Sequence, residues 1–284
     1  QGFDKGELIE AGLTVAGKNG GVYDKFRARL MLPVIDVRGD VTGFTSRILP
    51  GVEGAKYLNT PETLIFKKGR LVYALNFARK TQRPNLVLVE GNIDVITLHQ
   101  AGFDNTVATM GTALTEEHVR LLGRYTKELV LCYDNDAAGE DATQRAIALL
   151  RSSEIGVKVL RLPKRRMLDG TLGKQDADDY IKNCGPAAFE ELMDGSANSA
   201  EYRLGVVQGR FDLSRDDQRA QYLLAAAEVV AGLPSPVERE IYAGRCAETA
   251  GVSKEAVLQE VARQRQKRRR ESARQEERRS LAPV

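Results

Sequence analysis

Apolar residues alternate with polar ones along residues 29–49, and the alternation breaks at Arg38, Gly39 and Asp40. This pattern predicts two β-strands joined by a tight turn, because side chains in a strand point to opposite faces in turn and glycine favours turns. The first part of the chain is therefore expected to contain a β-hairpin.

Short continuous apolar runs characterise the next region. The run 85–89 precedes apolar residues at helical spacing that end at Ala101. The same succession recurs, with strands expected at 106–109, 129–133 and 157–162 and helices at 115–125 and 142–150. Strands that alternate with helices at this spacing are typical of an α/β layer with a parallel sheet.

Strand patterns disappear after Pro186, and only helical patterns follow. The expected helices cover 189–193, 202–207, 218–230, 237–250 and 254–264. The fold class is therefore α/β, followed by a helical bundle.

Charge is unevenly distributed, although the net charge is only +3. Residues 1–80 are net basic, residues 81–200 are net acidic, and residues 263–279 form a short basic run with almost no apolar side chain. That run cannot bury a core, so it is expected to be a solvated helix extension or a linker, with a nucleic-acid contact as the alternative.

The chain has three cysteines and no CxxC pair, so we expect no zinc in this segment. No apolar run approaches the ~18 residues that a membrane span needs, and a signal peptide is not recognisable, so no membrane partner is expected and the location is expected to be cytoplasmic.

Acidic residues stand at or just after the ends of the predicted strands, namely Glu90, Asp134, Asp136, Asp176 and Asp178. The carboxyl ends of parallel strands meet at one edge of a sheet, where ligands gather. Carboxylates crowded there repel one another unless cations neutralise them, and all-oxygen ligand sets suit Mg²⁺ or Mn²⁺.

Each acidic set also has a purely structural interpretation. Asp134 and Asp136 precede a helix and are typical helix caps, Asp176 and Asp178 are typical of an acidic first helical turn, and Glu90 before a glycine is common at strand ends. Gly111 and Thr112 begin a loop that is either a plain turn or a close backbone approach to phosphate.

The ordered motifs resemble the Toprim domain of bacterial DnaG-type primases. They are VEGNIDV (89–95), ATMGTAL (108–114), CYDNDAAG (132–139) and DADDYI (176–181). Upstream, YDKFRARLMLP (23–33), GFTSR (43–47) and KYLNTPE (56–62) are similar to the basic subdomain that precedes Toprim in that family.

The resemblance implies a partial basic subdomain over 1–82, a Toprim domain over 83–185, a helical subdomain over 186–264 and a basic linker tail over 265–284. It further implies that the zinc-binding module of these primases lies outside this chain, and that a replicative helicase is contacted through a region C-terminal to Val284.

The resemblance also implies site residues. Glu90, Asp134 and Asp136 would be catalytic, and with Asp176 and Asp178 would bind two or more Mg²⁺ or Mn²⁺ ions; whether Glu90 is a ligand or a general base stays open. Template DNA and nucleotides would be bound by Arg27, Arg29, Arg47, Lys56, Tyr57, Asn59 and Lys68.

The function implied is RNA primer synthesis from nucleoside triphosphates on single-stranded DNA at the bacterial replication fork, by two-metal nucleotidyl transfer. Two alternatives remain at this point. One is another Toprim enzyme, a nuclease or a topoisomerase; the other is a single-stranded DNA or helicase-binding module without catalysis.

Overall fold

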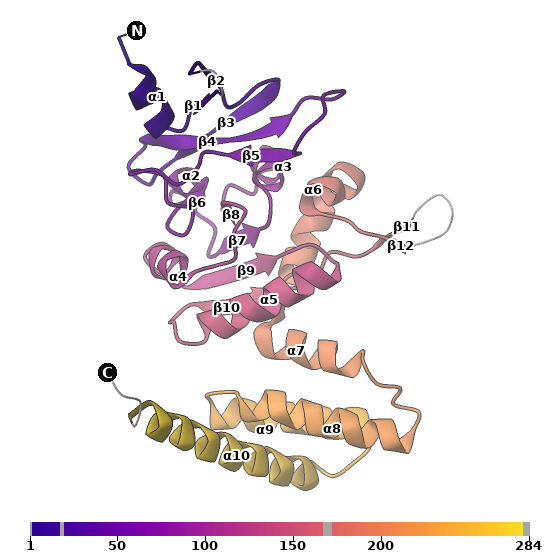
Figure 1. The fold of residues 1–284 in the computed structure, drawn as a ribbon. Helices are drawn as coiled ribbons and strands as arrows, with labels where there is room; N and C mark the ends of the chain where they lie inside the picture. The colour runs from indigo at the N-terminus through magenta and orange to yellow at the C-terminus, as the bar shows by residue number, and fades with distance from the viewer. Residues whose placement is uncertain (1, 18–19, 167–171, 281–284) are drawn as a thin grey trace. The chain divides into compact units, whose positions relative to one another are not determined.

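The computed structural model describes residues 2–17, 20–166 and 172–280, and the chain divides into two compact units, Gln1–Ser196 and Ala197–Val284. Figure 1 shows the two units in chain order, from indigo at the N-terminus to yellow at the C-terminus. Within the described residues, no helix combines the length and the apolar character that crossing a membrane requires.

The first unit begins with antiparallel structure. Helix α1 (Lys5–Glu10) is followed by the paired strands β1 (Thr14–Ala16) and β2 (Val22–Asp24). Strands β3 (Arg29–Ile35), β4 (Val41–Ile48) and β5 (Tyr57–Asn59) then form a three-stranded antiparallel sheet. The predicted hairpin is thus confirmed.

Asp36 closes the turn of that hairpin. Its Oδ1 accepts the backbone N–H groups of Arg38, Gly39 and Asp40 at 2.8, 3.0 and 3.0 Å. Gly39 has a φ of 103°, a left-handed conformation that favours glycine. The turn therefore owes its shape to one carboxylate and one glycine.

The central sheet contains β6 (Val72–Tyr73), β7 (Leu86–Val89), β8 (Thr106–Thr109), β9 (Glu128–Cys132) and β10 (Gly156–Val159), in the order β10-β9-β7-β8-β6 within this unit. All neighbouring pairs are parallel except β6 with β8. The predicted parallel α/β sheet is therefore confirmed, with one antiparallel strand at its edge.

Helices cover both faces of this sheet. They are α2 (Leu75–Ala78), α3 (Asn92–Gln100), α4 (Glu116–Leu122), α5 (Ala137–Leu150) and α6 (Ala177–Asp194), and a small hairpin of β11 (Arg165–Arg166) and β12 (Leu172–Gly173) precedes α6. Right-handed connections place α3 on one face and α4 and α5 on the other.

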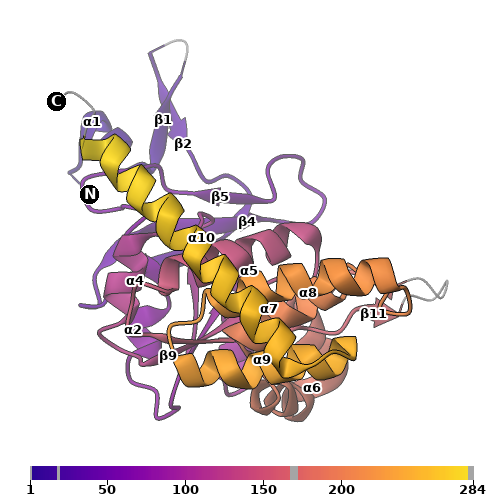
Figure 2. The ribbon, with the colours of Figure 1, turned by 90° about the horizontal axis from the view of Figure 1, so that it is seen from below.

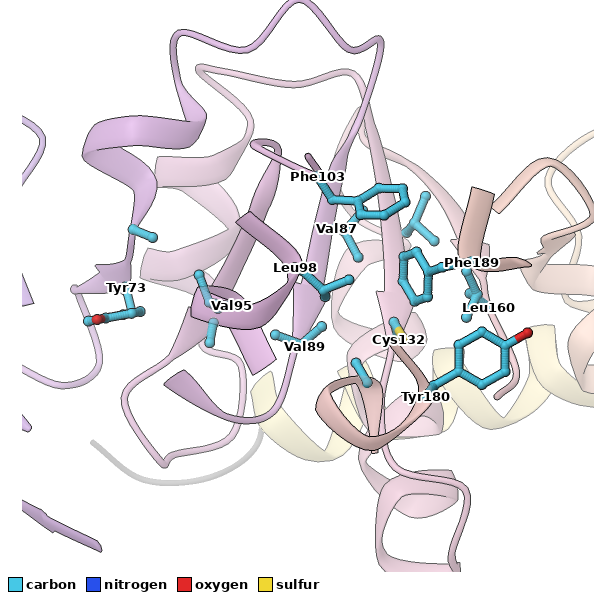
Figure 3. Packing of buried hydrophobic residues seen from close by; sticks show 14 of the residues in the cluster. Tyr73, Val87, Val89, Val95, Leu98, Phe103, Cys132, Leu160, Tyr180 and Phe189 are labelled. Atoms are coloured by element: carbon cyan, nitrogen blue, oxygen red, sulfur yellow. The ribbon is translucent and has the colours of Figure 1, made fainter. Parts of the chain in front are cut away.

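The face under α3 and α6 carries the main hydrophobic core. Figure 3 shows Leu98 between Val87 and Val89 of β7, with Phe103 and Phe189 nearby. Leu86 and Leu88 alternate with them along β7 and are equally buried, so they face the α4–α5 side. A strand buried on both faces explains the continuous apolar run in the sequence.

Helix α6 bends at Gly185, whose φ is 82°, just before Pro186. The chain after the bend still packs into the first unit, since the Phe189 ring is fully buried and meets Phe103 with ring centroids 4.8 Å apart. The first unit consequently extends to Ser196, beyond the boundary expected at residue 185.

The second unit is a helical bundle. The short strand β13 (Ala197–Asn198) is followed by α7 (Ser199–Gln208), α8 (Asp216–Ala231), α9 (Pro236–Ala250) and α10 (Lys254–Ser280). Its core includes Tyr222, Ala226, Ala243 and Cys246. The predicted bundle is confirmed, with α10, the yellow helix in Figure 2, in contact with α8 and α9.

Residues 265–280 of the expected basic tail continue α10 as helix, which is the helix extension among the two forms expected for this run; residues 281–284 lie outside the described residues. The side chains of Val257 and Val261, near the start of α10, are buried in the bundle. Further along the helix, Arg268 donates a hydrogen bond to the backbone carbonyl of Glu228 at 2.9 Å. Packing and this bond on α8 let a strongly charged segment remain helical.

Candidate metal centre and nucleic-acid interface

Glu90 and Asp134 meet at the edge of the central sheet. In the register of the two strands Val89 lies opposite Cys132, so the residues that follow leave the sheet side by side. Glu90 Oε1 accepts the backbone N–H of Asp134 at 2.9 Å, across 44 positions of sequence. The topology therefore brings two of the predicted site motifs together.

Asp136 has two partners at the same edge. It is the N-cap of α5, where its Oδ1 accepts the N–H of Gly139 at 2.8 Å. Its other oxygen lies 2.8 Å from Lys174 Nζ, which also pairs with Asp134. The cap interpretation is correct for Asp136, but it does not account for the lysine shared by two carboxylates.

Asp94 lies between the acidic motifs, and the sequence reasoning did not select it. Its side chain is only 8 % exposed and accepts the N–H groups of Gly91 and Asp178, both at 3.1 Å. One feature of the sequence pointed to it, namely a carboxylate four positions after Glu90 and between the apolar residues Ile93 and Val95.

Asp176, Asp178 and Asp179 each offer an oxygen, and these oxygens lie within 4.8 Å of one another. Asp176 caps α6 by accepting the N–H of Asp179 at 2.8 Å. Asp178 is buried and bonds to Thr97 Oγ1 at 2.5 Å and Lys182 Nζ at 2.6 Å. The predicted pair thus lies together beside Asp94, with Asp179 as an additional neighbour.

The carboxylates change one another's proton affinity. Burial, with Asp176 the next contributor, raises the pKa of Asp94 to about 7. Removal of the Glu90 carboxylate from water raises its pKa, and the Asp134 charge adds to this. Lys174 lowers the pKa of Asp136, and the two carboxylates raise the pKa of Lys174. The site therefore concentrates negative charge that needs a cation.

This donor set fits a divalent metal. Its tightest part, among the described residues, is the trio Asp176, Asp178 and Asp179, whose oxygens lie within 4.8 Å of one another. Glu90 and Asp94 are joined to Asp134 and Asp178 through backbone N–H groups, not through shared oxygen positions. Such oxygen sets suit hard cations like Mg²⁺. The ammonium group of Lys174 pairs with Asp134 and Asp136 and so neutralises part of the negative charge of these carboxylates.

We call Glu90, Asp94, Asp134, Asp136, Asp176 and Asp178 the acidic cluster. A basic strip, formed by Arg47 on β4 and Lys56 just before β5, lies near it. Arg47 and Lys56 flank the Tyr57 ring, with their charged groups 5.9 and 5.6 Å from its centroid. Burial raises the pKa of the Tyr57 hydroxyl, and the charges of Asp94, Asp176 and Asp178 add to this shift. Three predicted nucleic-acid residues are thus adjacent to one another and within electrostatic reach of the carboxylates.

The other predicted nucleic-acid residues are more dispersed. Arg27 lies over Tyr23 at 5.0 Å, and Arg29 is partly buried with its Nη1 lacking a hydrogen-bond partner among the described residues. Asn59 donates to the Met110 carbonyl at 3.1 Å. The backbone of Lys68 is fixed by a hydrogen bond between its carbonyl oxygen and His118 Nε2 at 2.9 Å.

Three protein-family models match successive parts of the chain. The model for the DNA primase catalytic core, N-terminal domain, matches residues 1–79, the Toprim-like model matches 87–181, and the model for the DnaB-helicase binding domain of primase matches 200–255. The last match lies within the chain, whereas the sequence analysis expects the helicase contact after Val284.

Curated relatives include the DNA primase of Clostridium acetobutylicum, 38% identical over 90% of this chain and 41% of its own length. The DNA primase of Escherichia coli K12 is 38% identical over 82% of this chain and 39% of its own length. The chain therefore spans about two fifths of the length of these relatives.

Solved structures agree with the fold. A DNA primase domain from Pseudomonas aeruginosa is 33% identical, with a TM-score of 0.71, over 92% of this chain and 81% of that chain. The RNA polymerase domain of Mycobacterium tuberculosis primase DnaG, in complex with double-stranded DNA, is 30% identical, with a TM-score of 0.74, over 89% and 79%. From its motifs, fold and relatives, the chain belongs to the bacterial DnaG primase family.

Proposed function

We propose that this chain is the RNA-synthesising core of a primase, which joins nucleotides into RNA primers on single-stranded DNA at the replication fork. The observation that carries the proposal is the Glu90–Asp134 hydrogen bond of 2.9 Å, which joins two acidic motifs at one sheet edge. Buried Asp94 extends this edge to Asp178.

In the proposed mechanism, Asp94, Asp134, Asp136, Asp176 and Asp178 hold Mg²⁺ or Mn²⁺ ions. Bound ions would activate the attacking 3′-hydroxyl and stabilise charge on the phosphoryl and leaving groups. Burial raises the pKa of Glu90, which favours its carboxylate as the proton acceptor in this mechanism. Lys174 would leave Asp134 and Asp136 as cations enter, and its exposed side chain is free to turn toward phosphate.

Template and nucleotide phosphates would be bound by Arg47 and Lys56, and Tyr57 offers a ring on which a base can stack. A related DnaG primase catalytic domain was solved bound to single-stranded DNA, which supports this assignment. Arg27, Arg29, Asn59 and Lys68 would extend the interface on the basic side of the first unit.

We also propose that the second unit contacts the replicative helicase. The support is the match of residues 200–255 to the DnaB-helicase binding domain of primase. The proposed contact therefore involves α7, α8 and α9, whereas the sequence led us to expect it after Val284.

The direct test is template-directed RNA synthesis by the full chain, with nucleoside triphosphates, Mg²⁺ or Mn²⁺, and single-stranded DNA. We expect Glu90→Gln and Asp134→Asn each to lower synthesis by at least 100-fold, while the exposed Asp141→Asn on α5 retains it. Metal-dependent cleavage of DNA without synthesis would instead indicate another Toprim enzyme. DNA binding with neither activity would indicate a binding module.

A further inference from the structure

A cavity of about 550 Å³ lies beside Glu90, between the loop after β8 and helix α5. We name it the α5 cavity. The loop side consists of Thr109, Gly111, Thr112, Ala113 and Leu114, and the helix side of Ala142, Arg145, Ala146 and Leu149, with Tyr133 and Glu90 completing the lining. Its volume lies within the range of small-molecule sites.

The helix side of the cavity follows from the sequence of α5. Arg145 and Ala146 lie three and four residues after Ala142, and Leu149 lies four and three residues after them, so the four residues share one helix face. The two alanines leave space, and the Arg145 guanidinium is exposed, without an ion pair or hydrogen bond among the described residues. This is an unneutralised cation in the wall of a cavity.

The loop side adds backbone N–H groups, which also attract anions. Thr109 Oγ1 donates to the Thr112 carbonyl at 2.7 Å, which folds the loop back over the strand end, and Gly111 has a φ of 68°. In the described part of the chain, the backbone N–H groups of Gly111, Thr112 and Ala113 donate to no acceptor. Successive free amides in such a loop attract anions.

Arg145 and the residues with the free amides thus line one cavity, from the helix side and the loop side, and guanidinium and amide N–H groups both favour phosphate oxygens. Leu114, Ala146 and Leu149 provide an apolar wall on which a sugar or base can lie. The mouth is shared with the acidic cluster through Glu90, whose charge repels phosphate unless a divalent cation lies between them.

We propose that the α5 cavity binds a nucleoside triphosphate as its Mg²⁺ complex, with the polyphosphate between Arg145 and the amides of residues 111–113. The inference rests on the proposed function, because it assigns a subsite for the nucleotide substrate next to the proposed metal centre. It places that subsite on the α5 side of the sheet, away from the basic strip.

The test measures binding of ATP with Mg²⁺, inorganic tripolyphosphate with Mg²⁺, and a single-stranded oligodeoxynucleotide to the full chain. We expect Arg145→Ala to weaken ATP and tripolyphosphate binding at least ten-fold, and Ala142→Leu, which fills the cavity, to weaken ATP binding without any change of charge. Arg120→Ala is the charge-matched control, because this exposed arginine on α4 lies outside the cavity. Equal thermal unfolding midpoints establish that the variants fold.

Unchanged ATP affinity in both Arg145→Ala and Ala142→Leu would overturn the proposal. So would loss of oligonucleotide binding with ATP binding intact, since the phosphate would then belong to a nucleic-acid strand. If the wild type binds ATP through Arg145 but makes no RNA, the proposed function fails while the cavity assignment stands. If RNA is made, Arg145→Ala should raise KM for nucleotides more than it lowers kcat.

Discussion

The Asp94 carboxylate accepts the backbone N–H of Asp178 at 3.1 Å, which joins the first turn of α3 to the first turn of α6 across 84 positions of sequence. This contact links the Glu90 side of the acidic cluster to the Asp176 side. Its energetic consequences can be measured in the metal-free protein.

Asp94 should make metal-free stability depend on pH. Its folded pKa of about 7 lies above the ordinary value of 3.8, so the folded state binds the extra proton between these values. The contribution of Asp94 to the free energy of unfolding is fully present below pH 4 and is lost as pH rises through 7. The loss is on the order of 4 kcal/mol. Urea unfolding with chelator should give a lower free energy of unfolding at pH 8 than at pH 5.

Asp94→Asn should reduce this difference between pH 5 and pH 8, because the amide does not ionise but retains an oxygen for the Asp178 N–H. Asp141→Asn on the exposed face of α5 is the matched control and should keep the wild-type difference. An Asp94→Asn profile as steep as that of the wild type would show that other groups cause it.

Lys174 should compete with divalent cations. Its ammonium group pairs with both Asp134 and Asp136, so a cation that enters must displace it. We expect Lys174→Ala to tighten Mn²⁺ binding several-fold, as measured by electron paramagnetic resonance titration. Lys158→Ala, which removes an ammonium paired with Glu128 at 3.2 Å, is the control and should leave the affinity unchanged. Weaker Mn²⁺ binding by Lys174→Ala would contradict competition.

Arg47 and Lys56 should contribute to the salt dependence of DNA binding. Removing a side chain that neutralises one phosphate reduces the slope of log K against log salt by about 0.7 for a single strand. We therefore expect Lys56→Ala and Arg47→Ala each to weaken single-stranded DNA binding and to flatten this slope by roughly that amount. Lys127→Ala, exposed and paired with Glu154, should not. A residue whose removal leaves the slope unchanged does not contact phosphate.

Phe189 should stabilise the first unit although it follows the bend at Gly185. Its fully buried ring packs edge-on against Phe103, so Phe189→Ala should lower the free energy of unfolding by about 3–5 kcal/mol. Phe189→Leu should be clearly less destabilising, since it leaves a smaller cavity. A decrease below about 1 kcal/mol for alanine would mean that α6 beyond Gly185 does not belong to this core.

The sequence predicted those elements whose own residues determine them. The run 85–89 had to be a buried strand because it is apolar on both faces, and the 29–49 hairpin carries its turn signal at Gly39. Convergence of Glu90 and Asp134 followed from parallel topology, since β7 and β9 are neighbours.

Other features depend on contacts that local patterns do not encode. Nothing in the local sequence distinguishes Lys174 from other lysines, because its role depends on the tertiary contact with Asp136. Asp94 likewise has the sequence context of an ordinary residue in a first helical turn, and only the folded chain brings it to Asp178. For the charged segment after 264 the sequence left a helix extension and a linker both open, because its stabilising partner, the Glu228 carbonyl, lies 40 positions away.

Asp136 has one further implication, since a single carboxylate both begins α5 and faces Lys174. Alanine scanning would overstate its chemical importance, because fraying of the first helical turn, worth about 1 kcal/mol, accompanies the missing charge. Asparagine caps a helix as well as aspartate does, so the difference between the two replacements separates architecture from reactivity at this position.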